Sequence, residues 1–196
     1  ELLEATATAE DERRLAEVVG GGFPLVVLDA YVKGAAAMAL EAPECGIPWW
    51  ALAGIGRIES RHGTHGGAEV RADGSLTRPI IGIPLNGTND TAVIWDSDGG
   101  LIDGDPLVDR AAGPMQFIPT TWARWGRDGD GDGDREIQNL YDAAAAAAAY
   151  LCASGPMTDD AGLARGYFSY NHSAAYVLNV LDQAHGYRDA IDVPPV

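Results

Sequence analysis

Hydrophobic residues recur at helical spacing along most of the chain. Within residues 49–60, Leu52, Ile55 and Gly56 are separated by three and one positions, which places them on one face of a helix. Residues 25–40 are rich in alanine and aliphatic side chains, and proline residues border both segments. Further helices are predicted over 119–125, 142–151, 159–168 and 173–185. The fold is therefore predicted to be mainly α.

Residues 61–110 lack this periodicity. They are rich in glycine, aspartate and proline, and only 80–83 and 92–95 have the short apolar runs expected of strands. We therefore predict a long irregular insertion with short strands. Farther along, the alanine run at 143–149 favours helix and permits close packing against a neighbouring helix.

The length suits one domain with a helical arm. Residues 1–44 are predicted to form that arm, packed on the core, and Leu15, Val18 and Val19 give it a short apolar stripe. Residues 45–196 are predicted to form the core domain. The chain begins with Glu rather than Met, which fits a leader that has been removed.

Composition excludes several classes of protein. The 196 residues include 13 Lys and Arg against 29 Asp and Glu, a formal net charge of −16. Such a charge repels nucleic-acid phosphates and anionic lipids, so we expect neither as a partner. With 46% hydrophobic residues the chain can bury a core. No apolar run reaches the ~20 residues of a membrane-spanning helix.

Two cysteines, Cys45 and Cys152, are too few for a disulfide framework or a structural zinc site. One bridge between them would stabilise the fold by about 4–5 kcal/mol in the chain-entropy model. It would require an oxidising compartment. Two buried free thiols are the alternative, and spacing alone leaves both open.

Glu59 continues the apolar face formed by Leu52, Ile55 and Gly56. A carboxyl group among apolar side chains has a raised pKa, as a general acid requires. The alternative is a frayed helix end with Glu59 in water. His62 and His65 follow at intervals of three, but the glycines between and after them end the helix. We therefore favour two exposed loop histidines over a metal site.

Residues 128–142 alternate aspartate and glycine in the pattern of a calcium loop, which needs converging oxygens and a sharp turn at glycine. The usual closing glutamate is absent, since Asn139 stands at its position, and Asp142 could close a longer loop instead. A solvated acidic turn is the alternative. We predict a structural Ca²⁺ and no organic cofactor. The predicted ligands are Asp128, Asp130, Asp132, Asp134 and Asp142.

Four segments in this order resemble the lytic murein transglycosylases of B type, glycoside hydrolase family 103, and most closely their secreted actinobacterial branch. The resemblance covers residues 45–186. Its segments are Ile58-Glu59-Ser60, Gly113-Pro114-Met115-Gln116-Phe117-Ile118-Pro119, the Asp/Gly loop running into Asp142-Ala143, and Tyr170-Asn171. Each segment alone is a weak signal, but the four in this order are specific.

The resemblance implies a lysozyme-like fold, an extracytoplasmic enzyme, which we expect to be monomeric, and peptidoglycan glycan strands as substrate. It implies that Glu59 is the single acid/base, cleaving the MurNAc-β-1,4-GlcNAc bond with formation of 1,6-anhydro-MurNAc. It also implies that the metal loop closes through Asp142. The residues that it places in the glycan groove are Ser60, Gln116, Phe117, Tyr170 and Asn171.

Two alternatives stay open. A hydrolytic muramidase would use a second carboxylate, which the acidic stretch of the insertion could supply through Asp96, Asp98, Asp103, Asp105 or Asp109. A non-catalytic, calcium-stabilised wall-binding module would keep the groove alone. The apolar face that ends in Glu59 argues against the second alternative, because binding does not require an acid there.

Overall fold

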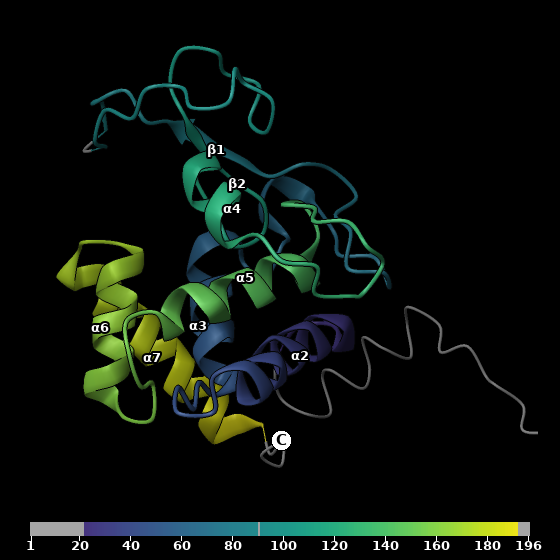
Figure 1. Ribbon diagram of the computed structural model, residues 1–196, viewed down its shortest axis with the longest axis vertical. Helices are drawn as coiled ribbons and strands as arrows, with labels where there is room; N and C mark the ends of the chain where they lie inside the picture. Colours follow the sequence, from purple (N-terminus) through teal and green to yellow (C-terminus); the bar gives the residue numbers. More distant parts are fainter. Residues whose placement is uncertain (1–21, 90, 192–196) are drawn as a thin grey trace, which may run out of the picture.

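The computed structural model describes residues 22–89 and 91–191, and in these residues the protein is mainly helical (Figure 1). The predicted helices are confirmed, with their ends shifted by a few residues, while the predicted stripe of Leu15, Val18 and Val19 lies outside the described residues. The helices are α2 (Leu25–Glu41), α3 (Trp49–Ser60), α4 (Pro119–Trp125), α5 (Leu140–Cys152), α6 (Asp160–Tyr170) and α7 (Ala174–Ala190).

Helix α3 is buried between α2 and α7 and carries the centre of the core. Leu52 and Ile55 are fully buried. A side-chain carbon added at Gly54 would lie 2.8 Å from the carbonyl oxygen of Val180 in α7. The two helices therefore approach closely, because α3 has no side chain at that position.

Helices α2 and α5 also approach closely at a glycine. A side-chain carbon at Gly34 would lie 3.1 Å from the backbone of Ala144. All seven alanines of 143–149 are buried, as the run of small residues predicts. Helix α2 shares one hydrophobic core with residues beyond 45. The proposed division of the chain at residues 44 and 45 stays a prediction.

The insertion rises from the helical body as a narrow lobe (Figure 1). At its base, strands β1 (Ile81–Pro84) and β2 (Arg110–Ala112) form an antiparallel pair with Ile81 opposite Ala112. The first predicted strand is thus confirmed. The second predicted strand, at 92–95, is wrong, because residues 93 and 95 form only isolated bridges within the lobe.

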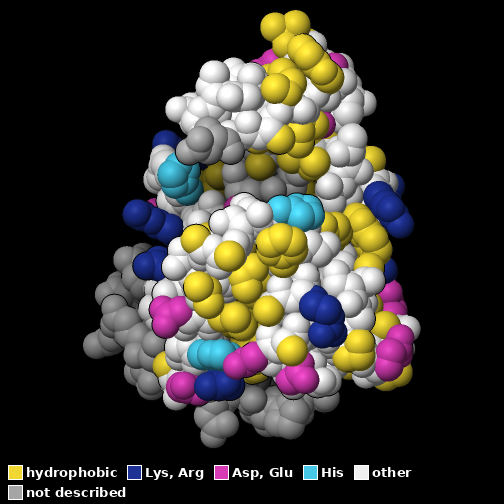
Figure 2. Space-filling view, turned by 90° about the vertical axis from the view of Figure 1, so that its left-hand side faces the viewer, with side chains coloured by type: hydrophobic (Ala, Val, Ile, Leu, Met, Phe, Trp, Pro, Cys, Tyr) yellow, Lys and Arg dark blue, Asp and Glu magenta, His cyan; other side chains and the backbone are white. Residues whose placement is uncertain are grey.

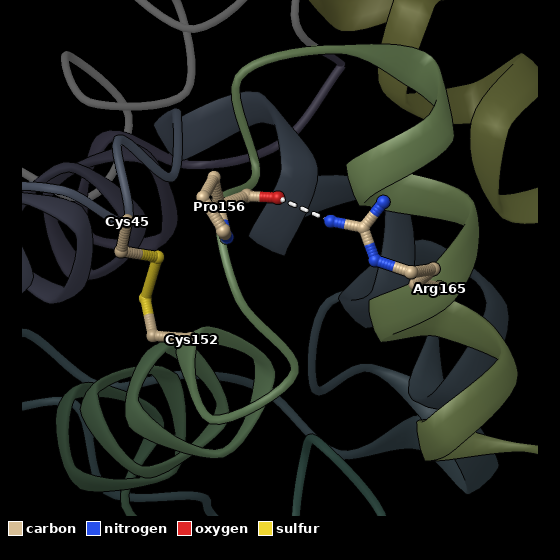
Figure 3. Close-up of a disulfide and its surroundings, with 4 residues drawn as sticks. All are labelled: Cys45, Cys152, Pro156 and Arg165. Carbon is tan, nitrogen blue, oxygen red and sulfur yellow. Dashed lines mark hydrogen bonds between the residues drawn. A yellow bond between two sulfur atoms is a disulfide. The ribbon is translucent and has the colours of Figure 1, made fainter.

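A disulfide joins Cys45, which precedes α3, to Cys152 at the end of α5 (Figure 3). Their Cα atoms lie 5.4 Å apart across 107 positions of sequence. The backbone N–H of Met157 donates to the Cys45 carbonyl at 2.7 Å. Arg165 of α6 donates to the Pro156 carbonyl at 3.1 Å (Figure 3). The disulfide and these bonds fasten α5, α6 and the start of α3 together.

No helix among the described residues combines the length and apolar character needed to cross a membrane.

Candidate active site

Glu59 lies in the last turn of α3, where the helix reaches the base of the insertion (Figure 1). Its side chain is partly buried, and the hydroxyl of Tyr176 donates a hydrogen bond of 2.6 Å to Oε1. Burial raises the pKa of Glu59 from 4.5 to about 7, although the bond from Tyr176 acts in the opposite direction. The carboxyl group can therefore give up and take back a proton near neutral pH.

Tyr176 is a residue of the site that the sequence did not indicate. It lies in the first turn of α7, beside the buried positions Val177 and Val180. From its spacing it belongs to the apolar face of that helix. Only the packing of α7 against α3 shows that its hydroxyl reaches Glu59.

The turn at residues 113–117 joins the end of α3 to α6. The buried hydroxyl of Ser60 donates to the Pro114 carbonyl at 2.6 Å. The hydroxyl of Tyr170 donates to the Met115 carbonyl at 2.7 Å. Gln116 has a φ of +53°, unusual for a residue other than glycine, and its amide donates to the Gly113 carbonyl at 2.8 Å. The structure thus brings together segments that are far apart in sequence.

The remaining predicted groove residues differ in exposure. Phe117 is buried, and its ring centroid lies 5.7 Å from Trp122 and 5.6 Å from Tyr170. Tyr170 is half-buried, and burial and the Glu59 charge both raise the pKa of its hydroxyl. Asn171 ends α6 and is exposed.

The surface is hollowed between the insertion and the helical body below it (Figure 2). Hydrophobic side chains gather around this hollow, on the face to which α6 and α7 belong (Figure 2). Ile58, next to Glu59, and Phe168, near the end of α6, are among the large hydrophobic residues that stay exposed.

One of the two loop histidines is not where the sequence predicts it. His65 is exposed, as expected. His62 is buried, because the chain turns back against α2 and α7 instead of continuing into solvent. Burial and the Arg57 charge lower the pKa of His62 to about 3, so its ring is neutral at physiological pH.

The aspartate loop brings three of its five predicted ligands together. Carboxylate oxygens of Asp128, Asp130 and Asp142 lie within 4.8 Å of one another. Asp132 and Asp134 are not in this group; a carboxylate oxygen of Asp132 accepts the backbone N–H of Asp134 at 2.8 Å. Burial raises the pKa of Asp142 to about 6, and the charges of Asp130 and Asp128 add to the effect.

The acidic stretch of the insertion builds the lobe itself. Each of its five carboxylates accepts hydrogen bonds from the lobe; for example, both oxygens of Asp96 receive the N–H of Gly99 at 3.0 Å. Asp105 is also bonded to Arg110 at 2.8 Å, and that bond lowers its pKa. The residues are Asp96, Asp98, Asp103, Asp105 and Asp109.

Comparison with known proteins gives one family and a set of similar folds. Residues 110–162 match the family described as Transglycosylase SLT domain. The Escherichia coli lytic transglycosylase Slt35, solved with bulgecin A, has 14% identity and a TM-score of 0.51, over 94% of this chain and 85% of that one. No curated protein sequence matches.

Two structures of SltB3 from Pseudomonas aeruginosa are similar at a lower score. The complex with NAG-anhNAM-pentapeptide has 20% identity and a TM-score of 0.49, over 92% of this chain and 68% of that one. The complex with NAG-NAM-pentapeptide has 19% identity and a TM-score of 0.47, over 96% of this chain and 72% of that one. The similarity to Slt35 shows that the chain has a lysozyme-like transglycosylase fold, and its segment at 110–162 matches the transglycosylase SLT domain.

Proposed function

We propose that this protein is a peptidoglycan lytic transglycosylase in which Glu59 is the single acid/base. The main support is the environment of the Glu59 carboxyl group. It is desolvated at the end of α3 and accepts a hydrogen bond from Tyr176. The match of 110–162 to the transglycosylase SLT domain and the fold shared with Slt35 support it.

In the first step the protonated Glu59 donates its proton to the oxygen that links MurNAc to GlcNAc, and the bond to C1 breaks. In the second step the 6-hydroxyl of the same MurNAc attacks C1, and Glu59 takes up the hydroxyl proton. One carboxyl group is enough, because the substrate supplies the nucleophile for which other glycosidases use a second carboxylate. The product is a 1,6-anhydro-MurNAc end.

The groove residues take the following roles in this proposal. Gln116 and Asn171 hydrogen-bond sugar substituents, and Tyr170 forms an apolar wall. Phe117 is buried, so it supports that wall by packing against Tyr170 and does not touch the sugar. Ser60 shapes the groove from beneath, since its hydroxyl bonds to the Pro114 carbonyl. No observation favours the hydrolytic alternative, because the five carboxylates at 96–109 are all engaged within the insertion.

A structural Ca²⁺ fits the aspartate loop. The converging oxygens of Asp128, Asp130 and Asp142 are the donors that a hard cation prefers, and three like charges this close repel one another without one. Bound there, the ion would tie the loop to the first turn of α5, which contains Asp142. It would stabilise the fold and take no part in the chemical steps.

We also propose an extracytoplasmic location, a monomeric state, and glycan strands of peptidoglycan as the partner. The disulfide supports the location, because such bonds persist in oxidising compartments.

Mass spectrometry of the fragments released from purified peptidoglycan tests the function. Anhydro-MurNAc ends from the native protein, absent with Glu59→Gln, are expected, because glutamine keeps the shape and loses the proton. Reducing ends would make the protein a muramidase. Binding to peptidoglycan without release by either protein would indicate a wall-binding module.

A further inference from the structure

Helix α3 ends in a turn whose backbone is strained, and the turn begins two residues after Glu59. Arg61 and His62 have φ values of +54° and +61°, and Gly63 follows at +79°. Left-handed backbone suits glycine, but it is unfavourable for arginine and histidine. Such a turn persists only where surrounding contacts hold it, and strain of this kind is concentrated at functional sites.

His62 is the residue through which the turn is held. Its backbone N–H donates to the Gly56 carbonyl at 2.8 Å, which closes the end of α3. Its ring is buried, with Nδ1 3.0 Å from the hydroxyl of Tyr31 and Nε2 2.8 Å from the hydroxyl of Tyr187. The ring of Phe23 packs against it, with centroids 4.5 Å apart.

The two tyrosines come from the helices on either side of α3. Tyr31 belongs to α2 and is fully buried; Tyr187 belongs to α7. The charge of Arg57, in the last turn of α3, disfavours the protonated ring of His62. A neutral imidazole has one donor and one acceptor nitrogen, so both bonds can form at once.

Helices α2 and α7 also contact the end of α3 close to Glu59. The hydroxyl of Tyr31 lies so close to Gly56, one turn before Glu59, that no side chain would fit there. Helix α7 carries both Tyr187 and Tyr176, the donor to Glu59. Among the described residues, the titratable groups with an electrostatic effect on or from Glu59 include the hydroxyls of Tyr176 on α7 and Tyr170 on α6.

We propose that Tyr31, His62 and Tyr187 form a positioning triad, which holds the strained turn after α3 and thereby keeps Glu59 in its apolar site. This inference rests on the proposed function for its catalytic meaning. The triad transfers no proton to substrate. When it is broken, the turn relaxes, water reaches the Glu59 carboxyl group, and the acid form is lost at neutral pH.

The test replaces His62 with Phe, which keeps the ring and removes both hydrogen bonds. We expect the alkaline limb of the kcat profile to move down by about one pH unit, with KM nearly unchanged. The matched control is His65→Phe, in the exposed segment that follows, for which both values should stay as in the native protein. Because a purely structural residue would lower the melting temperature without moving the limb, an unmoved limb in folded His62→Phe overturns the proposal.

Tyr187→Phe is the second variant, in case His62→Phe does not fold. It removes one of the two bonds from a partly exposed residue, so a smaller shift in the same direction is expected. An unchanged kcat profile in Tyr187→Phe would contradict the triad, as an unmoved alkaline limb in His62→Phe would.

A titration without substrate separates this inference from the proposed function. The Glu59 carboxyl signal can be followed by carbon NMR in labelled protein and assigned by its loss in Glu59→Gln. A lower midpoint in His62→Phe supports the triad, and an equal midpoint rejects it. If the native protein releases no anhydro ends, the proposed function fails while this measurement still decides the triad.

Discussion

At the scale of the residue, two opposing effects act on the carboxyl group of Glu59. Burial favours its neutral form, and the hydrogen bond from Tyr176 favours its ionised form. Burial is the larger effect, and it raises the pKa to about 7. A group that must first donate and later accept a proton works best near the pH at which both forms are populated.

Glu59→Gln should make the protein more stable at pH 8. The pKa of Glu59 is higher in the folded state than the ordinary 4.5, so the native state keeps a proton that the unfolded state has released. The free energy of unfolding therefore falls as pH rises from about 4.5 towards 7, by on the order of 1–3 kcal/mol.

Glutamine removes this cost, and the melting temperature should rise by a few degrees at pH 8. The difference between the two proteins should vanish near pH 4, where the carboxyl group is protonated in both states. Equal melting temperatures at pH 8 would show that Glu59 is well solvated.

Tyr176→Phe should move the alkaline limb of the kcat profile to higher pH. The hydroxyl of Tyr176 stabilises the ionised carboxylate, so its loss raises the pKa of Glu59 further. This shift is opposite to that expected for His62→Phe. A downward shift in both variants would mean that each simply admits water to the site.

At the scale of the element, glycines decide how closely the helices approach α3. Gly54 faces α7, and Gly56 faces the hydroxyl of Tyr31, so neither position has room for a side chain. Both are in the middle of a helix, where glycine is intrinsically unfavourable by about 0.5–1 kcal/mol relative to alanine. Close packing of α3 against its neighbours offsets that cost.

Gly56→Ala should therefore destabilise the protein, by about 2–4 kcal/mol, because the new methyl group overlaps the hydroxyl of Tyr31. Gly186→Ala is the matched control, since Gly186 is an exposed glycine of α7 with nothing near its added carbon. There the same change should stabilise by up to about 1 kcal/mol. Urea unfolding of both variants measures the difference, and a neutral Gly56→Ala would contradict the packing described.

At the scale of the whole molecule, two links hold distant parts of the chain together. The disulfide joins the segment before α3 to the end of α5, and the aspartate loop meets the start of α5 through Asp142. Helix α5 is thus fastened at both of its ends. The site lies where α3, the 113–117 turn and α6 converge.

Removal of Ca²⁺ by a chelator should lower the melting temperature, because an ion bound only by the native state stabilises it by mass action. Asp142→Asn should reduce this dependence, since it removes one of the three converging carboxylates. Asp132→Asn is the control. Its melting temperature should depend on Ca²⁺ nearly as in the native protein, because Asp132 is outside the converging group. An identical melting curve with and without chelator would reject the calcium site.

Much of the architecture could be predicted from local pattern. The helices follow from spacing and from the proline residues that border them, and the alanine run predicted close packing. The second predicted strand failed because an apolar run at 92–95 has the composition of a strand but finds only isolated bridges. The strand that does pair with β1 is Arg110–Ala112, where the sequence analysis predicted none.

The site was predictable only in part. Glu59 stands out because a carboxylate continues an apolar stripe, which is a local signal. Tyr176 and His62 carry no such signal, since a tyrosine on an apolar face and a histidine after a helix are ordinary. The hydrogen-bond partners of His62 are remote in sequence. Tyr31 of α2 is 31 positions away, and Tyr187 of α7 is 125 positions away.

The sequence by itself determined the helices, the acid at the end of α3 and the set of carboxylates in the aspartate loop, because backbone preference and side-chain chemistry act over a few residues. Only the tertiary structure decided the pKa of Glu59, the burial of His62, the disulfide and which aspartates converge. Desolvation, hydrogen bonds between helices and the meeting of two thiols all depend on distances between segments that no local pattern contains.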